Sequence, residues 1–167
     1  DYRLGQIHRM DNVETYLGSD VTVEDILEFG SEHIVLATGS SWRNDGVGRH
    51  HLFPQKFPEE KAYTPDDIFA GRHPNGKVVI YDDDHYYLGG VIAELCRENG
   101  CDVTLVTPAA VVSSWTFHTL EQGMIQSGLL KKGVKILPHH VVHLGANSTP
   151  ESGLYSVHIY TKEVSIL

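Results

Sequence analysis

One segment, residues 77–90, constrains the fold of this chain more than any other. Residues 78–81 form an apolar run of the kind that predicts a buried strand. Three carboxylates follow directly, and an apolar stripe at helical spacing then runs from Leu88 to Cys96, ended by Asn99 and Gly100. A strand joined by a sharp turn to an amphipathic helix is the first half of a βαβ unit. We therefore expect an α/β fold with parallel strands.

The sharp turn lies where a Rossmann-type unit keeps its phosphate-binding loop. A working loop has the pattern G-x-G-x-x-G, but Tyr81, Asp83 and Tyr86 stand at its three glycine positions. Gly89 and Gly90 come later, where they can still let the helix approach the sheet. A pyrophosphate about 4 Å from one carboxylate meets a repulsion of about 1 kcal/mol in water and about 4 kcal/mol at an effective dielectric of 20. We therefore expect a scaffold that has lost its phosphate contacts.

The acidic turn also allows other interpretations. Asp82 and Asp84 after a strand resemble the nucleophile motif of haloacid-dehalogenase-like phosphohydrolases, although the later strands end in Thr107-Pro108 and Pro138-His139, which offer no acid. A metal bound by residues 82–85 is a second alternative. A freestanding nucleotide-binding module is a third. The simplest interpretation is a solvated acidic turn that caps the following helix, and it implies no metal site.

Histidines elsewhere in the chain give no clear metal signature. His139 and His140 point to opposite faces if the chain is extended there, and His143 completes no recognisable ligand set. We expect these three to be surface or strand-edge residues. The pair His50 and His51 lies in an irregular stretch and is expected to be a solvated loop.

Turn-forming residues divide the chain into three parts. Residues 1–41 are expected to hold strands at 13–17 and 33–37 around a short helix at 23–29, with Thr22 or Asp20 as its N-cap and Gly30 as its stop. Residues 42–63, rich in Gly and Pro, are expected to be a linker. Residues 64–167 alternate helix and strand. Beyond the segment already described, we predict helices at 65–69 and 119–130 and strands at 103–106, 134–137, 140–144 and 155–160.

Composition excludes several classes of partner. The net charge of −9 makes nucleic acid an unsuitable partner. No apolar run approaches the roughly 20 residues that a membrane span requires, so no membrane partner is expected. The two cysteines, Cys96 and Cys101, imply no disulfide scaffold and fit a reduced, cytoplasmic setting, with both side chains buried as small apolar groups.

Several motifs resemble one enzyme family. Residues 34–39 end in Ala37, Thr38 and Gly39, which is similar to the "ATG" strand end of flavoproteins with two dinucleotide-binding domains. The continuation from Trp42 to Asp45-Gly46, and later residues 63–71, resemble the trimethylamine, dimethylamine and histamine dehydrogenases. The acidic turn at 82–87 and residues 115–122 are most similar to the histamine dehydrogenase branch. The resemblance covers about residues 1–145.

This resemblance implies a fragment of an amine dehydrogenase-like flavoprotein oxidoreductase. The parent protein would have a TIM barrel with FMN, a [4Fe–4S] cluster, and a site for ADP or FAD. It would be a homodimer that passes electrons to an electron-transfer flavoprotein or another acceptor. The barrel, the cluster cysteines and every catalytic residue are expected outside this chain, with the first G-x-G-x-x-G before Asp1 and the closing strand after Leu167.

Within the fragment, the resemblance implies two domain types. Residues 1–41 would be part of an FAD- or ADP-binding-type domain, in which Ala37, Thr38 and Gly39 line the adenine nucleotide. Residues 64–167 would form a three-layer, Rossmann-like NAD(P)-binding-type domain. We expect the fragment alone to be inactive and to hold no bound cofactor.

Overall fold

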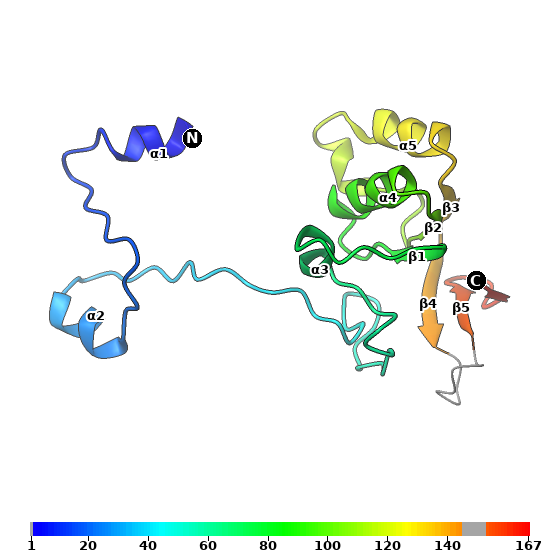
Figure 1. Cartoon of the computed structure of the whole chain (residues 1–167), viewed down its shortest axis with the longest axis horizontal. Helices are drawn as coiled ribbons and strands as arrows, with labels where there is room; N and C mark the ends of the chain where they lie inside the picture. The colour runs from blue at the N-terminus through cyan, green and yellow to red at the C-terminus, as the bar shows by residue number, and fades with distance from the viewer. Residues whose placement is uncertain (1, 145–152) are drawn as a thin grey trace. The chain divides into compact units, whose positions relative to one another are not determined.

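The computed structural model describes residues 2–144 and 153–167 of the chain. It divides into two compact units, Asp1–Gly39 and Ser40–Leu167 (Figure 1). Among the described residues, no helix is long and apolar enough to cross a membrane.

The first unit contains two short helices, α1 (Tyr2–Ile7) and α2 (Val23–Phe29). Helix α2 begins at a capping box, because the Thr22 hydroxyl accepts the N–H of Asp25 while the Asp25 carboxylate accepts the N–H of Thr22. It ends at Gly30, whose φ of 69° is the left-handed conformation of a C-cap glycine. The prediction for this helix, with Thr22 as N-cap and Gly30 as stop, is confirmed.

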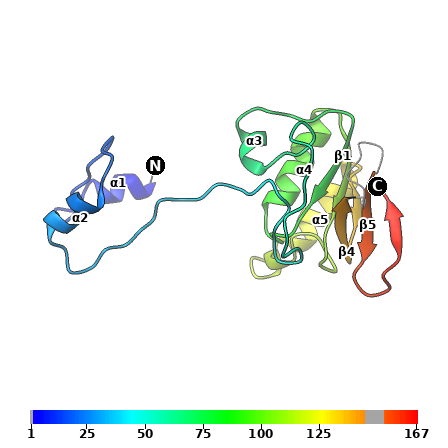
Figure 2. The same cartoon turned by 90° about the horizontal axis from the view of Figure 1, so that it is seen from below.

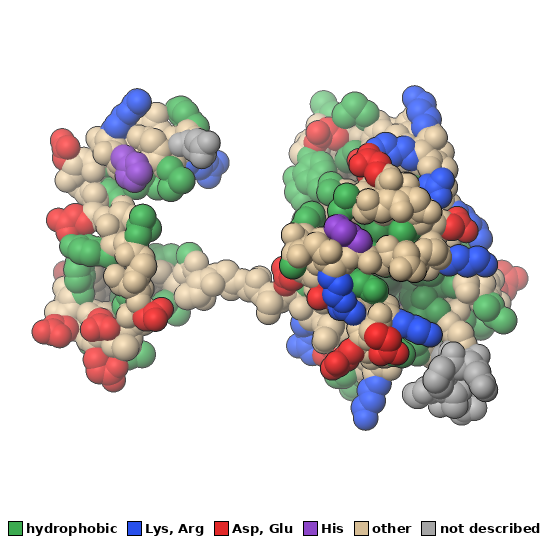
Figure 3. All heavy atoms as spheres, viewed as in Figure 1, with side chains coloured by type: hydrophobic (Ala, Val, Ile, Leu, Met, Phe, Trp, Pro, Cys, Tyr) green, Lys and Arg blue, Asp and Glu red, His purple; other side chains and the backbone are tan. Residues whose placement is uncertain are grey.

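The two strands predicted for the first unit are wrong. Residues 13–17 and 33–37 have no regular structure, and the described part of this unit, residues 2–39, contains no strand. A strand requires a neighbour for its backbone N–H and C=O groups, and residues 2–39 supply none. The apolar side chains of both segments are exposed, with Leu17 at 84% and Val35 at 88%, and Figure 3 shows apolar side chains on the surface of the unit.

The second unit is built on a parallel three-stranded sheet in the order β1 (Lys77–Tyr81), β2 (Asp102–Val106) and β3 (Lys135–Leu137). Helix α4 (Leu88–Glu98) connects β1 to β2, and α5 (Gln122–Lys131) connects β2 to β3. An antiparallel sheet of β4 (His140–Leu144), β5 (Leu154–His158) and β6 (Val164–Ile166) follows. Both views place β4 and β5 on the other side of the parallel sheet from α4 (Figures 1 and 2). The α/β prediction is confirmed at this level.

The core of this unit lies between the parallel sheet and its helices. It is formed by buried side chains from β2, from α4 and α5, from α3 (Pro65–Phe69) and from the segments that connect these elements. Its members are Ile68, Ile92, Ala93, Cys96, Cys101, Val103, Leu105, Val112, Leu129 and Val134. Both cysteines are free and buried, as the sequence predicts. The apolar stripe of α4 therefore packs on the core through Ile92 and Cys96, whereas Val91 is 46% exposed.

Local signals set most boundaries in this unit correctly. Helix α3 starts at Pro65 with Thr64 as N-cap in a second capping box, and Gly71 follows its end with a φ of 92°. Helix α5 starts three residues later than predicted. A short 3-10 helix, η1 (Ser114–Phe117), precedes it, and Leu120 has a φ of 62°, which interrupts any continuous helix there. Strand β6 was not predicted.

Residues 42–63 contain no helix or strand. They belong to the second unit, and part of this stretch lies directly on the end of β1. His51 is only 8% exposed.

Candidate functional site

The site is the turn that follows β1, and its first residue, Asp82, is buried. The N–H of Asp82 donates to the carbonyl of Val106 at 2.9 Å, which extends the β1–β2 pairing by one residue. Asp82 is only 3% exposed, and its Oδ1 accepts the N–H of His85 at 3.0 Å. Burial raises the pKa of the Asp82 carboxyl, and the hydrogen bond from His85 opposes that shift.

The turn is therefore not the solvated helix cap that the sequence favours. Asp82 is enclosed, and the residue that precedes α4 is Tyr87, which makes no side-chain capping bond in the described structure. The cause is the chain's path. Asp82 continues the strand inward, and the polypeptide then makes a compact turn in which His85 adopts a φ of 65° before the helix begins.

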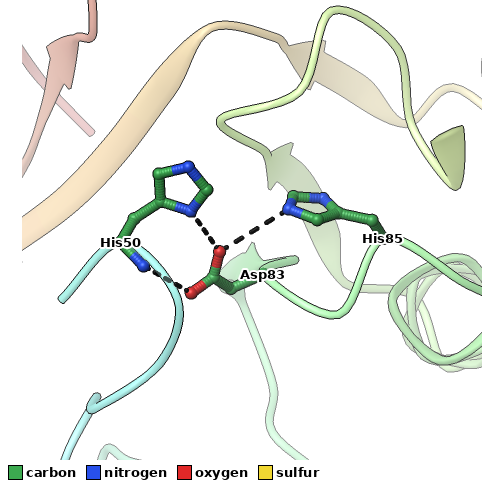
Figure 4. Close-up of side chains that lie close together, drawn as sticks. All are labelled: His50, Asp83 and His85. Atoms are coloured by element: carbon green, nitrogen blue, oxygen red, sulfur yellow. Dashed lines mark hydrogen bonds and ion pairs between the residues drawn. The ribbon is translucent and has the colours of Figure 1, made fainter. Parts of the chain in front are cut away.

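Asp83 is held by a histidine from the irregular stretch of residues 42–63. Oδ1 of Asp83 lies 2.6 Å from His50 Nδ1, and Oδ2 accepts the His50 N–H at 3.1 Å (Figure 4). His85 approaches from the other side, with its Nε2 3.6 Å from Asp83 Oδ1. His50 makes these contacts while its side chain stays 40% exposed, but the expectation of a solvated loop is wrong for His51, which is only 8% exposed.

Two glycines allow this close approach. A Cβ on Gly48 would overlap Oδ2 of Asp83, so the loop can reach the carboxylate only because residue 48 has no side chain. A Cβ on Gly89 would lie 2.8 Å from Cγ of Asp82, so α4 packs on the turn for the same reason. The loop at residues 46–51 thus lies against the carboxylate of Asp83.

A second cluster of polar side chains, His51, Tyr81 and His143, lies beside this turn. The His51 ring is 5.5 Å from the Tyr81 ring and 4.6 Å from the His143 ring, between centroids. Burial lowers the pKa of His51, and the neighbouring His143 adds to that effect. Burial also lowers the pKa of His143 and raises that of Tyr81. Among the described residues, His51 Nε2, Tyr81 Oη and Asp82 Oδ2 have no hydrogen-bond partner.

Three side chains offer ligand atoms for a metal. The ligand atoms of His50, Asp83 and His85 all lie within 4.8 Å of one another, and within the described residues this is the one such group of three or more. The sequence prediction considered residues 82–85 but not His50, which is 33 residues from Asp83. No spacing rule connects them, and only the folded chain brings them together.

The predicted nucleotide-lining residues lie elsewhere. Ala37, Thr38 and Gly39 are exposed residues without regular structure at the end of the first unit, and Gly39 has a φ of 75°. Their contact with an adenine nucleotide stays a prediction.

Comparisons with known proteins now identify the family. Residues 63–158 match the family model described as "OYE-like second alpha/beta domain". The chain belongs to this family. The match covers the region from α3 to β5, including the whole acidic turn.

Three relatives extend this assignment. Dimethylamine dehydrogenase of Hyphomicrobium sp. (strain x) is 30% identical over 148 residues, which are 82% of this chain and 20% of that protein. The structure of histamine dehydrogenase from Rhizobium sp. 4-9 matches with a TM-score of 0.82 and 44% identity, over 99% of this chain and 26% of that one. The structure of 6-hydroxypseudooxynicotine amine oxidase (HisD) from Pseudomonas geniculata N1 matches with a TM-score of 0.81 and 34% identity, over 99% and 24%.

The chain therefore spans only a fifth to about a quarter of the length of these relatives. The resemblance to the dimethylamine and histamine dehydrogenases is confirmed. The phosphohydrolase interpretation has no support from these matches.

Proposed function

We propose that this chain is part of an amine dehydrogenase-like flavoprotein oxidoreductase, in which it has a non-catalytic role. The proposal is supported by the 44% identity to histamine dehydrogenase over nearly the whole chain. On this proposal the parent carries FMN and a [4Fe–4S] cluster in and beside a TIM barrel, and ADP or FAD in a separate site. The parent is a cytoplasmic homodimer and passes electrons to an electron-transfer flavoprotein or another acceptor.

The second unit is, on this proposal, an NAD(P)-binding-type Rossmann domain that no longer binds a dinucleotide. One observation carries this point: the carboxylate of Asp83 stands at a glycine position of the phosphate loop and is held there by His50 at 2.6 Å. A phosphate would have to displace the loop at residues 46–51 and then face this negative charge. The N–H of His85, one of the backbone donors in this turn, already donates to Asp82 Oδ1 at 3.0 Å, so it cannot bind a phosphate in this conformation.

The first unit, with Ala37, Thr38 and Gly39, completes an adenine-nucleotide site only together with further segments of the parent. On this proposal residues 1–41 belong to the FAD-type domain, residues 42–63 join the two domains, and residues 64–167 form the NAD(P)-type domain. The exposed apolar side chains of the first unit are consistent with a surface that other parts of the parent cover.

Two experiments test the proposal. Isothermal titration calorimetry of the chain with NADH and NADPH should give dissociation constants weaker than about 1 mM. This value corresponds to a binding free energy of less than about 4 kcal/mol in magnitude. A value below about 10 μM would refute the loss of dinucleotide binding. An unrelated NADH-binding dehydrogenase serves as the positive control for the nucleotide stocks.

The parent assignment has its own test. The absorption spectrum of the full-length protein should show bound flavin and an iron–sulfur cluster. A full-length protein without either chromophore, after cofactor reconstitution, would refute the oxidoreductase assignment while leaving the dinucleotide result unaffected.

A further inference from the structure

The strongest unexplained feature of the second unit is the convergence of His50, Asp83 and His85. Two imidazoles and one carboxylate come from two separate segments, and their ligand atoms lie within 4.8 Å of one another (Figure 4). Nε2 of His85 is 3.6 Å from Oδ1 of Asp83, which is longer than a hydrogen bond. The histidine faces the carboxylate but does not bond to it directly.

The surroundings hold two of these three side chains in place. His85 is 6% exposed, its N–H donates to Asp82, and its carbonyl accepts the N–H of Trp115 at 3.0 Å. Its other ring nitrogen, Nδ1, lies 3.3 Å from the hydroxyl of Thr107. A histidine that ligates a metal is typically oriented in this way by a partner on its second nitrogen.

Asp83 is oriented by the backbone as well as by a side chain. Its Oδ2 accepts the N–H of His50, which leaves Oδ1 directed between the two imidazoles. The backbone of His85 has a φ of 65°, an uncommon conformation for a residue with a side chain. Such conformations persist where the surrounding structure enforces them, and they cluster at functional sites.

We propose that His50, Asp83 and His85 bind one Zn²⁺ ion, with water as the fourth ligand. Metal–ligand distances of about 2.0–2.1 Å in a tetrahedron place the ligand atoms about 3.3 Å apart. The two nitrogens lie 2.6 and 3.6 Å from Asp83 Oδ1, on either side of that value, and all three ligand atoms lie within 4.8 Å of one another, so binding the ion requires movements of the order of 1 Å. His50 is half-exposed on a surface loop, so it can move and the ion can enter past it.

The ligand set selects the class of ion. Imidazole nitrogen suits Zn²⁺ and its neighbours in the first transition row, whereas Mg²⁺ and Ca²⁺ require mainly oxygen ligands. Zinc binding replaces the hydrogen bond between His50 Nδ1 and Asp83 Oδ1, and neutral His50 then carries its ring proton on Nε2. The ion fastens the loop at residues 46–51 to the turn after β1. This site is independent of the proposed redox function.

Zinc titration of the metal-stripped 167-residue chain tests the proposal. Competition with a chromophoric chelator should give one site with an apparent dissociation constant of about 10 μM or tighter. Asp83→Asn and His50→Gln should each weaken it by at least about tenfold. His73→Gln, an exposed histidine outside the cluster, is the matched control and should leave the affinity unchanged.

Two further measurements keep the result interpretable. The His85→Asn variant removes the third ligand and introduces a residue that tolerates positive φ. Circular dichroism of every variant shows whether it folds. Co²⁺ in place of Zn²⁺ should give the intense visible bands of a four-coordinate site, and these bands should be lost in folded Asp83→Asn.

Three results would overturn the proposal. One is zinc affinity that is the same in folded Asp83→Asn, folded His50→Gln and the original chain. Another is an apparent dissociation constant weaker than about 10 μM for the original chain. The third is a loss of binding in His73→Gln equal to that in His50→Gln. Any of these would leave the three residues as a hydrogen-bonded clamp only.

Discussion

The packing of α4 against the end of β1 depends on Gly89, and the adjacent Gly90 provides a matched control. A Cβ at Gly89 would lie 2.8 Å from Cγ and 2.9 Å from Cβ of Asp82. A Cβ at Gly90 would have its nearest contact at 3.6 Å, with Cγ2 of Ile125, which is an ordinary van der Waals distance. Asp82 is buried directly after the strand, so it cannot swing away. We expect Gly89→Ala to force the helix from the turn and Gly90→Ala to be accommodated.

The comparison isolates the steric effect. Both substitutions fall in the first turn of α4, so the gain in helix propensity, up to about 1 kcal/mol, is similar in the two variants. Overpacking a close contact costs about 1–3 kcal/mol. Gly89→Ala should therefore have a free energy of unfolding about 1–3 kcal/mol below that of Gly90→Ala. Each kcal/mol corresponds to a difference of about 2–8 °C in Tm for domains of this size range.

Urea unfolding followed by circular dichroism measures the two free energies, with the original chain as reference. If Gly89→Ala is as stable as Gly90→Ala, with an unchanged denaturant slope, then α4 can move without cost. The close-approach argument for this glycine would then be wrong.

Three other predictions follow from local features. Thr64→Ala removes the N-cap of α3 and should lower the unfolding free energy of the second unit by about 0.5–2 kcal/mol. Thr64→Asn, which can still cap the helix, should lower it less, and equal decreases in the two variants would contradict this role of Thr64. Burial lowers the pKa of His143 below 6.5, so its folded form resists protonation and stability should fall as pH drops through about 6.5. His143→Gln should lose less stability than the original chain between about pH 7 and pH 5, and identical losses in urea midpoint would refute that cause. Hydrogen exchange should be faster at Leu36, which lies outside any strand, than at Ile80 in β1, and equal protection would show that residues 33–37 are held by pairing.

The sequence was sufficient wherever the determining interactions are local. The capping boxes at Thr22 and Thr64 involve residues three apart, and both helices begin where these signals predict. Helix α4 was recognised from its apolar stripe. The start of α5 was missed because Leu120 takes a left-handed conformation, which its side chain does not indicate.

Strands were predicted well only where partners exist in the chain. Residues 78–81 and 103–106 pair with each other in β1 and β2, in parallel register. Residues 13–17 and 33–37 have comparable apolar character but no neighbouring strand in residues 2–39, and they have no regular structure. An apolar pattern shows that a segment can form a strand. Whether it does so depends on a partner strand that can lie far away in the sequence.

The acidic turn shows the same limit for a functional site. The sequence shows that Tyr81 and Asp83 are not glycines, but it does not show how the folded chain accommodates the carboxylates of the turn. Asp82 is buried with a raised pKa, and Asp83 is bonded to His50 through two contacts. Burial thus disfavours the charged form of Asp82, whereas the Asp83 carboxylate is bound by His50.

If the second unit has lost dinucleotide binding, as we propose, the arrangement of this turn predicts what would be needed to restore it. Glycine at residue 83 would remove the repulsion and leave the backbone free to approach a pyrophosphate. The loop at residues 46–51 would still lie over the turn, because the buried ring of His51 packs 5.5 Å from the ring of Tyr81, between centroids. Restoring the glycine pattern alone should therefore fail. Binding would require removal of both the carboxylate and the loop that has adapted to it.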